Sequence, residues 1–245
     1  MTLVTGGLAA VAGRGSGTAW VVLAVLAGQL FVGWTNDYLD RGLDRDAGRE
    51  DKPLAQDALS PGSVRAAAAV ALVAAVPLSL ASGVPAALVH FVAIASATAY
   101  NFGLKSTRLS AVPYAVSFAL LPAFVTLGLT QPHWPPLWIM AVAALIGVGG
   151  HFAQARPDVE RDRRQGVGGL PERMGDRGSA ILAATFLAAG ASVTAIATRN
   201  GVPLVALVTA AGVAVTAPNV AFWLTLATAV ITAGTFVLIG ASALR

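Results

Sequence analysis

The chain has 245 residues, of which 56% are hydrophobic and only 11% are charged, and its mean hydropathy is +0.71. Soluble domains carry roughly 25% charged residues, so this composition excludes an ordinary soluble protein and indicates a polytopic membrane protein. The basic residues behind the net charge of +4 do not form Lys/Arg-rich runs with aromatic residues, so no nucleic-acid partner is expected. The lack of cysteine excludes disulfides and thiolate metal sites.

Glycine, proline and charged residues divide the chain into nine apolar segments. The first, at about 3–13, is too short to cross a bilayer, which takes about 20 apolar residues, so we predict a short or truncated first helix there. No basic region precedes it, so a cleaved signal peptide is not expected. The other eight segments are predicted to span the membrane: 18–41, 64–82, 85–103, 111–129, 136–156, 178–198, 202–217 and 219–243. The expected fold is all-α, with residues 1–245 forming a single transmembrane domain of about eight to nine helices.

The charged residues predict how the segments are oriented. Of the 16 Lys and Arg residues, 13 lie in the connections that follow the second, fourth and sixth segments. The positive-inside rule therefore places these three connections on the cytoplasmic side. All 12 acidic residues lie in two blocks on that same side, at 37–57 and 158–176.

The first acidic block contains a motif at the end of the second segment, NDYLDRGLDRD at 36–46. At 100° per residue, Asp37, Asp40 and Asp44 lie within about 60° of one another around a helix. Three carboxylates therefore project from one helical face, with Asn36 beside them.

The second acidic block repeats this arrangement in RPDVERDRR, where Asp158 and Asp162 are one helical turn apart. Carboxylate oxygens suit hard cations, and Mg²⁺ is typically held by one or two carboxylates together with substrate phosphates. We therefore expect Asp37, Asp40, Asp44, Asp158 and Asp162 to bind Mg²⁺. The acidic residues Glu172 and Asp176 are interpreted as solvated loop charges.

Basic residues accompany both motifs. Arg45, Arg49 and Lys52 follow the first, Arg161, Arg163 and Arg164 surround the second, and Lys105 ends the stretch YNFGLK after the fourth segment. Cations beside a magnesium site can hold a diphosphate and stabilise its charge as it leaves. The alternative interpretation, that these residues only set the topology or contact lipid headgroups, stays open.

Both acidic motifs resemble those of the UbiA superfamily of intramembrane prenyltransferases. NDYLDRGLD fits the pattern N-D-x-x-D-x-x-x-D, and DVERD fits D-x-x-x-D. YNFGLK, with Tyr100 and Lys105, resembles that family's Tyr-x-x-x-x-Lys segment, and DKPLA with the following SPG resembles its basic-Pro loop. The resemblance covers nearly the whole chain and implies a nine-helix bundle around a central cavity, in which the aspartates bind Mg²⁺ and a prenyl diphosphate.

The resemblance also implies a reaction. A prenyl group would pass from a polyprenyl diphosphate to a small aromatic or lipophilic acceptor after ionisation of the allylic diphosphate. The expected catalytic residues are Asp37, Asp40, Asp44, Asp158, Asp162 and Lys105. The residues expected to bind the diphosphate or substrate are Asn36, Arg45, Arg49, Lys52, Tyr100, Lys105 and Arg163. The expected location is a bacterial plasma membrane, with the active site facing the cytoplasm and without an obligatory protein partner.

Two departures leave alternatives open. The shortened first helix favours a terpene cyclase of the same superfamily, which needs no acceptor pocket. His151 stands where many members carry a further acid, so the number of metal ions is open. A divalent-cation transporter is a third hypothesis, but a transport site normally lies near the midplane, and here every acid is on one side. A catalytically inactive relative is the fourth.

Overall fold

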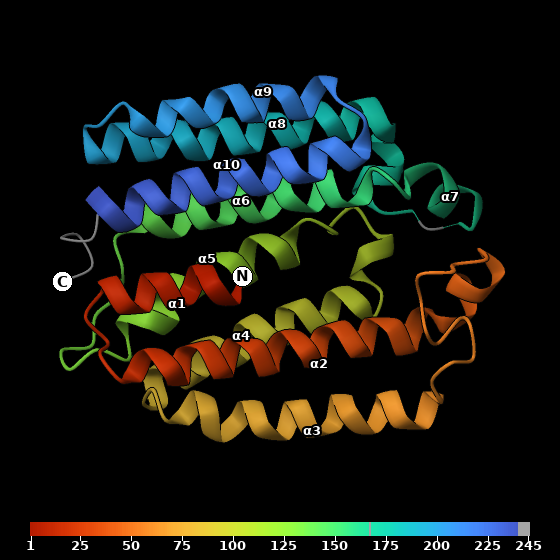
Figure 1. Ribbon diagram of the computed structural model, residues 1–245, viewed down its shortest axis with the longest axis horizontal. Coiled ribbons are helices and arrows are strands. Elements are labelled where there is room, and N and C mark those ends of the chain that lie inside the picture. Colours follow the sequence, from red (N-terminus) through yellow and green to blue (C-terminus); the bar gives the residue numbers. More distant parts are fainter. Residues whose placement is uncertain (167, 240–245) are drawn as a thin grey trace.

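A computed structural model describes residues 1–166 and 168–239, with side chains in these ranges up to residue 235. The described chain is all-helical, as the composition predicts (Figure 1). Its α-helices are α1 (Thr2–Val11), α2 (Gly17–Asp46), α3 (Pro61–Leu80), α4 (Val84–Asn101), α5 (Val112–Thr126), α6 (Leu137–Ala155), α7 (Val159–Arg164), α8 (Leu170–Thr198), α9 (Ala206–Val215) and α10 (Pro218–Ile239). Two short 3-10 helices, η1 (Leu104–Ser106) and η2 (Val202–Val205), complete the described elements.

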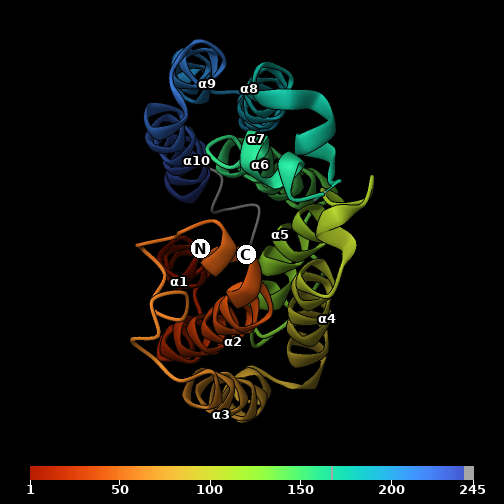
Figure 2. The same ribbon diagram turned by 90° about the vertical axis from the view of Figure 1, so that its right-hand side faces the viewer.

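The long helices run roughly side by side and form two groups, which Figure 2 shows end on. In the first group α2 packs against α3 and α4, and α4 packs against α5. In the second α8 packs against α6 and α9, and α10 packs against α9. Contacts between α5 and α6 join the groups on one side, and α1 contacts both α2 and α10 on the other. The helices therefore surround a central space instead of packing as two flat layers.

Five helices in the described ranges, α2, α3, α4, α6 and α8, are long and apolar enough to cross a bilayer. The apolar helices α1, α5 and the combined η2–α9 stretch are shorter. Helix α1 has ten residues and coincides with the first predicted segment. The predicted segment 219–243 corresponds to α10, and its part beyond residue 239 lies outside the described residues.

Helix α8 begins earlier than its predicted segment at 178, because its first turns carry charged residues that hydropathy does not detect. Gly175 interrupts these turns with φ 73° and ψ 175°, a conformation that favours glycine. Beside this kink the buried Arg156 forms an ion pair of 2.7 Å with Asp176. Arg156 also donates hydrogen bonds of 2.9 Å to the carbonyl oxygens of Val213 and Thr216, where α9 ends. These bonds join the end of α6 to α8 and to the end of α9. Because Arg156 precedes α7 and Asp176 follows it, they fix the chain on both sides of the second acidic motif.

Candidate active site

A cavity of about 730 Å³ lies inside the bundle and is lined mainly by α2, α4, α5 and α6. Its wall is charged at the end of the bundle where α7 and the α2–α3 connection lie together (Figure 1). Farther inside, the wall is mostly apolar, with Val25, Ile94, Phe118 and Leu121. Helix α2 has 30 residues and is about 45 Å long, whereas the hydrocarbon core of a bilayer is about 30 Å thick. The charged end can therefore reach the interface while the apolar part stays at membrane depth.

The first acidic motif lies in the last turns of α2. Asn36, Asp37, Asp40 and Asp44 all line the cavity, as their predicted common helical face requires. Asp40 forms an ion pair with Lys105 from η1, and each of these two side chains is only 18% exposed. The lysine of the Tyr-x-x-x-x-Lys segment thus lies directly beside the motif.

The end of α2 returns the chain toward this motif. Gly48 has φ 65°, and its N–H donates to the carbonyl oxygen of Arg45 at 3.0 Å. The N–H of Arg49 donates to the carbonyl oxygen of Asp44, also at 3.0 Å, which completes a Schellman motif. The turn directs the following segment back over α2, where Lys52 Nζ lies 2.5 Å from Asp37 Oδ1.

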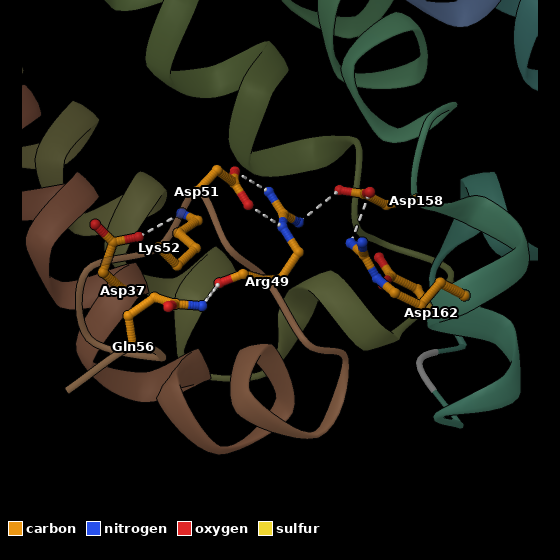
Figure 3. A network of polar contacts seen from close by, with 8 residues as sticks. Asp37, Arg49, Asp51, Lys52, Gln56, Asp158 and Asp162 are labelled. Carbon is orange, nitrogen blue, oxygen red and sulfur yellow. Dashed lines mark hydrogen bonds and ion pairs between the residues drawn. The ribbon is translucent and has the colours of Figure 1, made fainter. Parts of the chain in front are cut away.

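Arg49 connects the two motifs across the cavity entrance (Figure 3). Its guanidinium donates two hydrogen bonds of 2.7 Å to Asp51 and one of 3.4 Å to Asp158. The bond with Asp51 raises the already high pKa of Arg49 and lowers the pKa of Asp51 to about 2. Arg49 is therefore fully charged and held in place by an exposed carboxylate, with one N–H group directed at the second motif.

The second acidic motif is carried by the short helix α7. Asp158 is the N-cap residue, and Asp162 follows one turn later, with its N–H donating to the carbonyl oxygen of Asp158 at 2.8 Å. Arg161 lies between them, 2.6 Å from Asp158 and 3.5 Å from Asp162. Burial raises the pKa of Asp162, and the nearby charge of Asp158 raises it further, whereas Arg161 lowers it.

The fit of these residues to Mg²⁺ depends on their donor chemistry. Within the described ranges, no three acidic or histidine side chains surround one point closely enough to hold a metal. Ion pairs with Lys52, Lys105, Arg49 and Arg161 occupy four of the five carboxylates instead, those of Asp37, Asp40, Asp158 and Asp162. All five aspartates nevertheless present oxygen donors to one cavity, and Mg²⁺ needs only one or two of them when phosphate and water complete its shell. The donor set therefore fits Mg²⁺ bound together with a diphosphate.

Two basic residues expected at the site lie elsewhere. Arg45 forms an exposed ion pair with Asp57, and Arg163 is exposed on α7; neither lines the cavity. Arg161, which was not among the residues expected to bind the substrate, is the α7 arginine that lines it. The interpretation of Glu172 as a solvated charge is wrong, because Glu172 is 7% exposed and lines the cavity.

Aromatic rings form part of the cavity wall next to Lys105. Tyr100, Tyr114 and His151 line the cavity, and their ring centroids are 4.6–5.7 Å apart. Ser110 Oγ lies 3.1 Å from His151 Nε2 and accepts a hydrogen bond of 3.0 Å from the N–H of Leu170. These contacts fix His151 against the start of α8. We refer to Tyr100, Tyr114 and His151 as the aromatic wall.

Solved structures with the same architecture come from UbiA homologues. A homologue from Archaeoglobus fulgidus bound to GPP and Mg²⁺ has a TM-score of 0.72 and 15% identity, over 99% of this chain and 95% of that one. The apo structure of a homologue from Aeropyrum pernix K1 has a TM-score of 0.70 and 16% identity, over 94% and 96%. A digeranylgeranylglyceryl phosphate synthase has a TM-score of 0.68 and 14% identity, over 98% and 93%. At these identities the similarity establishes the fold.

The family itself follows from the sequence. No curated protein matches the chain. The sequence model of the UbiA prenyltransferase family matches residues 1–225, which is most of the chain and includes both acidic motifs. The protein is therefore an integral membrane prenyltransferase and belongs to the UbiA prenyltransferase family.

Proposed function

We propose that the protein is a Mg²⁺-dependent enzyme that transfers a prenyl group from a polyprenyl diphosphate to a small aromatic or lipophilic acceptor. The observation that carries this proposal is that both acidic motifs and four basic side chains line the charged end of one cavity whose inner wall is apolar. A prenyl diphosphate has the same two parts, a polyanionic head and a hydrocarbon tail. We place the active site on the cytoplasmic side of a bacterial plasma membrane, because the connections at this end carry most of the basic residues.

The five aspartates of the two motifs would hold Mg²⁺ with the diphosphate. Three lie on α2, one is the N-cap residue of α7 and one lies within α7, and all five line the cavity. When bound, Mg²⁺ neutralises the charge that develops on the leaving diphosphate. The GPP and Mg²⁺ bound to the Archaeoglobus fulgidus homologue support this assignment.

The basic side chains would bind the diphosphate oxygens directly. Lys52 and Lys105 contact the first motif, while Arg49 and Arg161 contact the second. A diphosphate between the motifs would offer these cations a stronger partner than a single carboxylate. Their fixed positive charges would then stabilise the diphosphate as the allylic C–O bond breaks. Asn36 beside Asp37 can donate a further hydrogen bond.

The apolar part of the cavity would hold the isoprenoid tail. Its wall includes Val25, Ile94, Phe118 and Leu121. This mostly apolar surface would hold the tail and keep water away from the reactive carbon. Exclusion of water matters because water would otherwise capture the allylic cation.

A terpene cyclase of the same family is the second candidate. The supporting observation is that one cavity with a mostly apolar inner wall would hold the isoprenoid chain, and a cyclase needs no further pocket. Cation transport is not favoured, because the acidic residues lie in two blocks of sequence that the structure brings to one end of the bundle.

The deciding experiment uses the purified protein in detergent with Mg²⁺ and geranyl, farnesyl or geranylgeranyl diphosphate. Diphosphate release and the extracted organic products are followed first without an acceptor and then with a panel of phenolic or quinone-like acceptors. Release only in the presence of an acceptor, with a prenylated product, would support the transferase. Release of a cyclic product without an acceptor would establish the cyclase and reject the transferase.

A further inference from the structure

Glu172 is a cavity carboxylate that neither acidic motif contains. It lies in the first turn of α8, lines the cavity and is 7% exposed. Its position follows from the start of α8, where Gly169 is the N-cap residue and Glu172 is the third helical residue. In this position a glutamate turns back toward the N-cap backbone, as in a capping box. The local fold therefore explains why the side chain is held in one orientation.

The Glu172 carboxylate lacks a full set of hydrogen-bond donors. The N–H groups of Gly169 and Glu172 lie beside it, and the positive end of the α8 dipole favours its negative charge. Nevertheless Oε2 is buried, and no donor in the described part of the chain forms a hydrogen bond with it. A buried acceptor without a partner costs about 1–3 kcal/mol, and such atoms in native structures call for an explanation.

Glu172 also differs from the motif carboxylates in its charge environment. Asp37 pairs with Lys52, Asp40 pairs with Lys105, and Asp158 pairs with Arg161. None of the ion pairs formed by residues 1–166 and 168–235 includes Glu172. The charged side chain that acts on it is Asp162, which has the same sign. A ligand that carries its own donor hydrogen would therefore be stabilised at this carboxylate.

The chemistry of the cavity narrows the kind of ligand. A diphosphate is an anion and would be repelled by Glu172, and an isoprenoid tail has no donor hydrogen. Mg²⁺ is assigned above to the five aspartates of the two motifs, and Glu172 belongs to neither motif. A hydroxyl group meets the requirement, since it can donate to the carboxylate and has a nucleophilic oxygen.

The aromatic wall favours a planar molecule next to Glu172. Tyr100 and Glu172 line the same cavity, and the rings of Tyr114 and His151 adjoin the ring of Tyr100. Aromatic ligands pack well against such rings in offset or edge-to-face arrangements. Gly169, at the start of α8, lies beside both the Glu172 carboxylate and the Lys105 carbonyl oxygen. Glu172 is therefore at the charged end of the cavity, where the diphosphate would bind.

We infer that Glu172 is a catalytic residue on the acceptor side, whose carboxylate accepts the hydrogen bond and then the proton of the hydroxyl group of an aromatic acceptor. The inference rests on the proposed function and specifies its acceptor. The C1–O bond of the donor breaks, and the diphosphate leaves with the electron pair. A bond forms between C1 and the acceptor hydroxyl oxygen, the hydroxyl proton passes to Glu172, and Glu172 returns it to water after the product leaves.

The test compares Glu172→Gln with Glu160→Gln, both in the full-length protein in detergent. Glutamine keeps the size of Glu172 and can still form the capping box, but it cannot take up a proton at neutral pH. Glu160 is an exposed acid on α7 that does not line the cavity. The donor is geranyl diphosphate with Mg²⁺, and the acceptor probes are p-cresol and 1-naphthol, each alongside its methyl ether. Prenyl-ether formation and equilibrium binding of geranyl diphosphate are measured separately.

We expect wild type and Glu160→Gln to prenylate the phenols and not the ethers. Glu172→Gln should be about a hundredfold slower, which is within the range of general-base catalysis, while geranyl diphosphate binding stays unchanged. Wild-type transfer rates in Glu172→Gln would overturn the inference but not the proposed function. Loss of geranyl diphosphate binding in this variant would do the same, because it would place Glu172 at the donor site. A wild-type protein that forms a cyclic product and no prenylated phenol would overturn the proposed function and the inference together.

Discussion

The two acidic motifs face one cavity but are supported in different ways. The first lies on the 30-residue helix α2, and its cationic partners Lys52 and Lys105 come from other elements. The second lies on the six-residue helix α7, and its main partner, Arg161, belongs to the motif itself. The first motif is therefore assembled by the tertiary fold, whereas the second is largely assembled by local sequence. Substitutions in the two motifs can show whether this difference matters for function.

The largest effect is expected when either motif loses a carboxylate. Asp37→Asn and Asp158→Asn should each lower Mg²⁺-dependent turnover by about 10²–10³-fold, comparable to the loss of one group that stabilises developing charge. Both side chains are about one-third exposed, so the variants should insert and fold normally. Turnover with geranyl diphosphate and the thermal midpoint in detergent test these statements. Full activity in either variant would contradict a site shared by both motifs.

Loss of a long-range partner should have a smaller effect. Lys105→Ala removes the cation next to Asp40, which is 18% exposed, and we expect geranyl diphosphate to bind about tenfold more weakly, a loss of about 1.4 kcal/mol. Arg108→Ala is the matched control, because Arg108 is an exposed cation in the same connection and does not line the cavity. Equal donor affinities in the two variants would reduce Lys105 to a residue that only sets the topology.

The sequence predicted the first motif better than its surroundings. Helical periodicity was sufficient to place Asp37, Asp40 and Asp44 on one face, because all three belong to one regular helix. Hydropathy located the membrane helices to within a few residues, apart from the charged first turns of α8 and the charged end of α2, which continues from residue 41 to residue 46. The burial of Glu172 could not be predicted, because it depends on how the start of α8 packs against the connection that contains Lys105.

The sequence also could not predict which of Arg45 and Arg49 lines the cavity. They are four residues apart and follow the same motif, so the sequence gives them equal roles. In the structure the Schellman motif at Gly48 separates them, and only Arg49 lines the cavity and contacts the second motif. A helical continuation past Gly48 would have placed both on neighbouring turns of one helix.

These two arginines provide a test of how the motifs are connected. Arg49→Gln should weaken binding of geranyl diphosphate by several-fold, about 1 kcal/mol, since Arg49 is partly exposed and screened by solvent. Arg45→Gln should leave binding nearly unchanged, because the Arg45–Asp57 pair is exposed to solvent. Isothermal titration of geranyl diphosphate into both variants distinguishes the two expectations. The structure predicts weaker binding in Arg49→Gln only, whereas the sequence predicts an equal loss in both.

The smallest expected effect concerns the turn itself, and it tests whether the fold assembles the first motif. Gly48→Ala places a Cβ at φ 65° and should lower the free energy of unfolding by about 1 kcal/mol. Gly42→Ala is the matched control, because Gly42 lies inside α2 and an added Cβ would point into open space there, so alanine should stabilise the helix by about 0.5–1 kcal/mol. If the turn positions Arg49 and Lys52, Gly48→Ala should also weaken donor binding while Gly42→Ala does not. A Gly48→Ala variant that is destabilised but binds geranyl diphosphate normally would show that the connection reaches the motif without this turn.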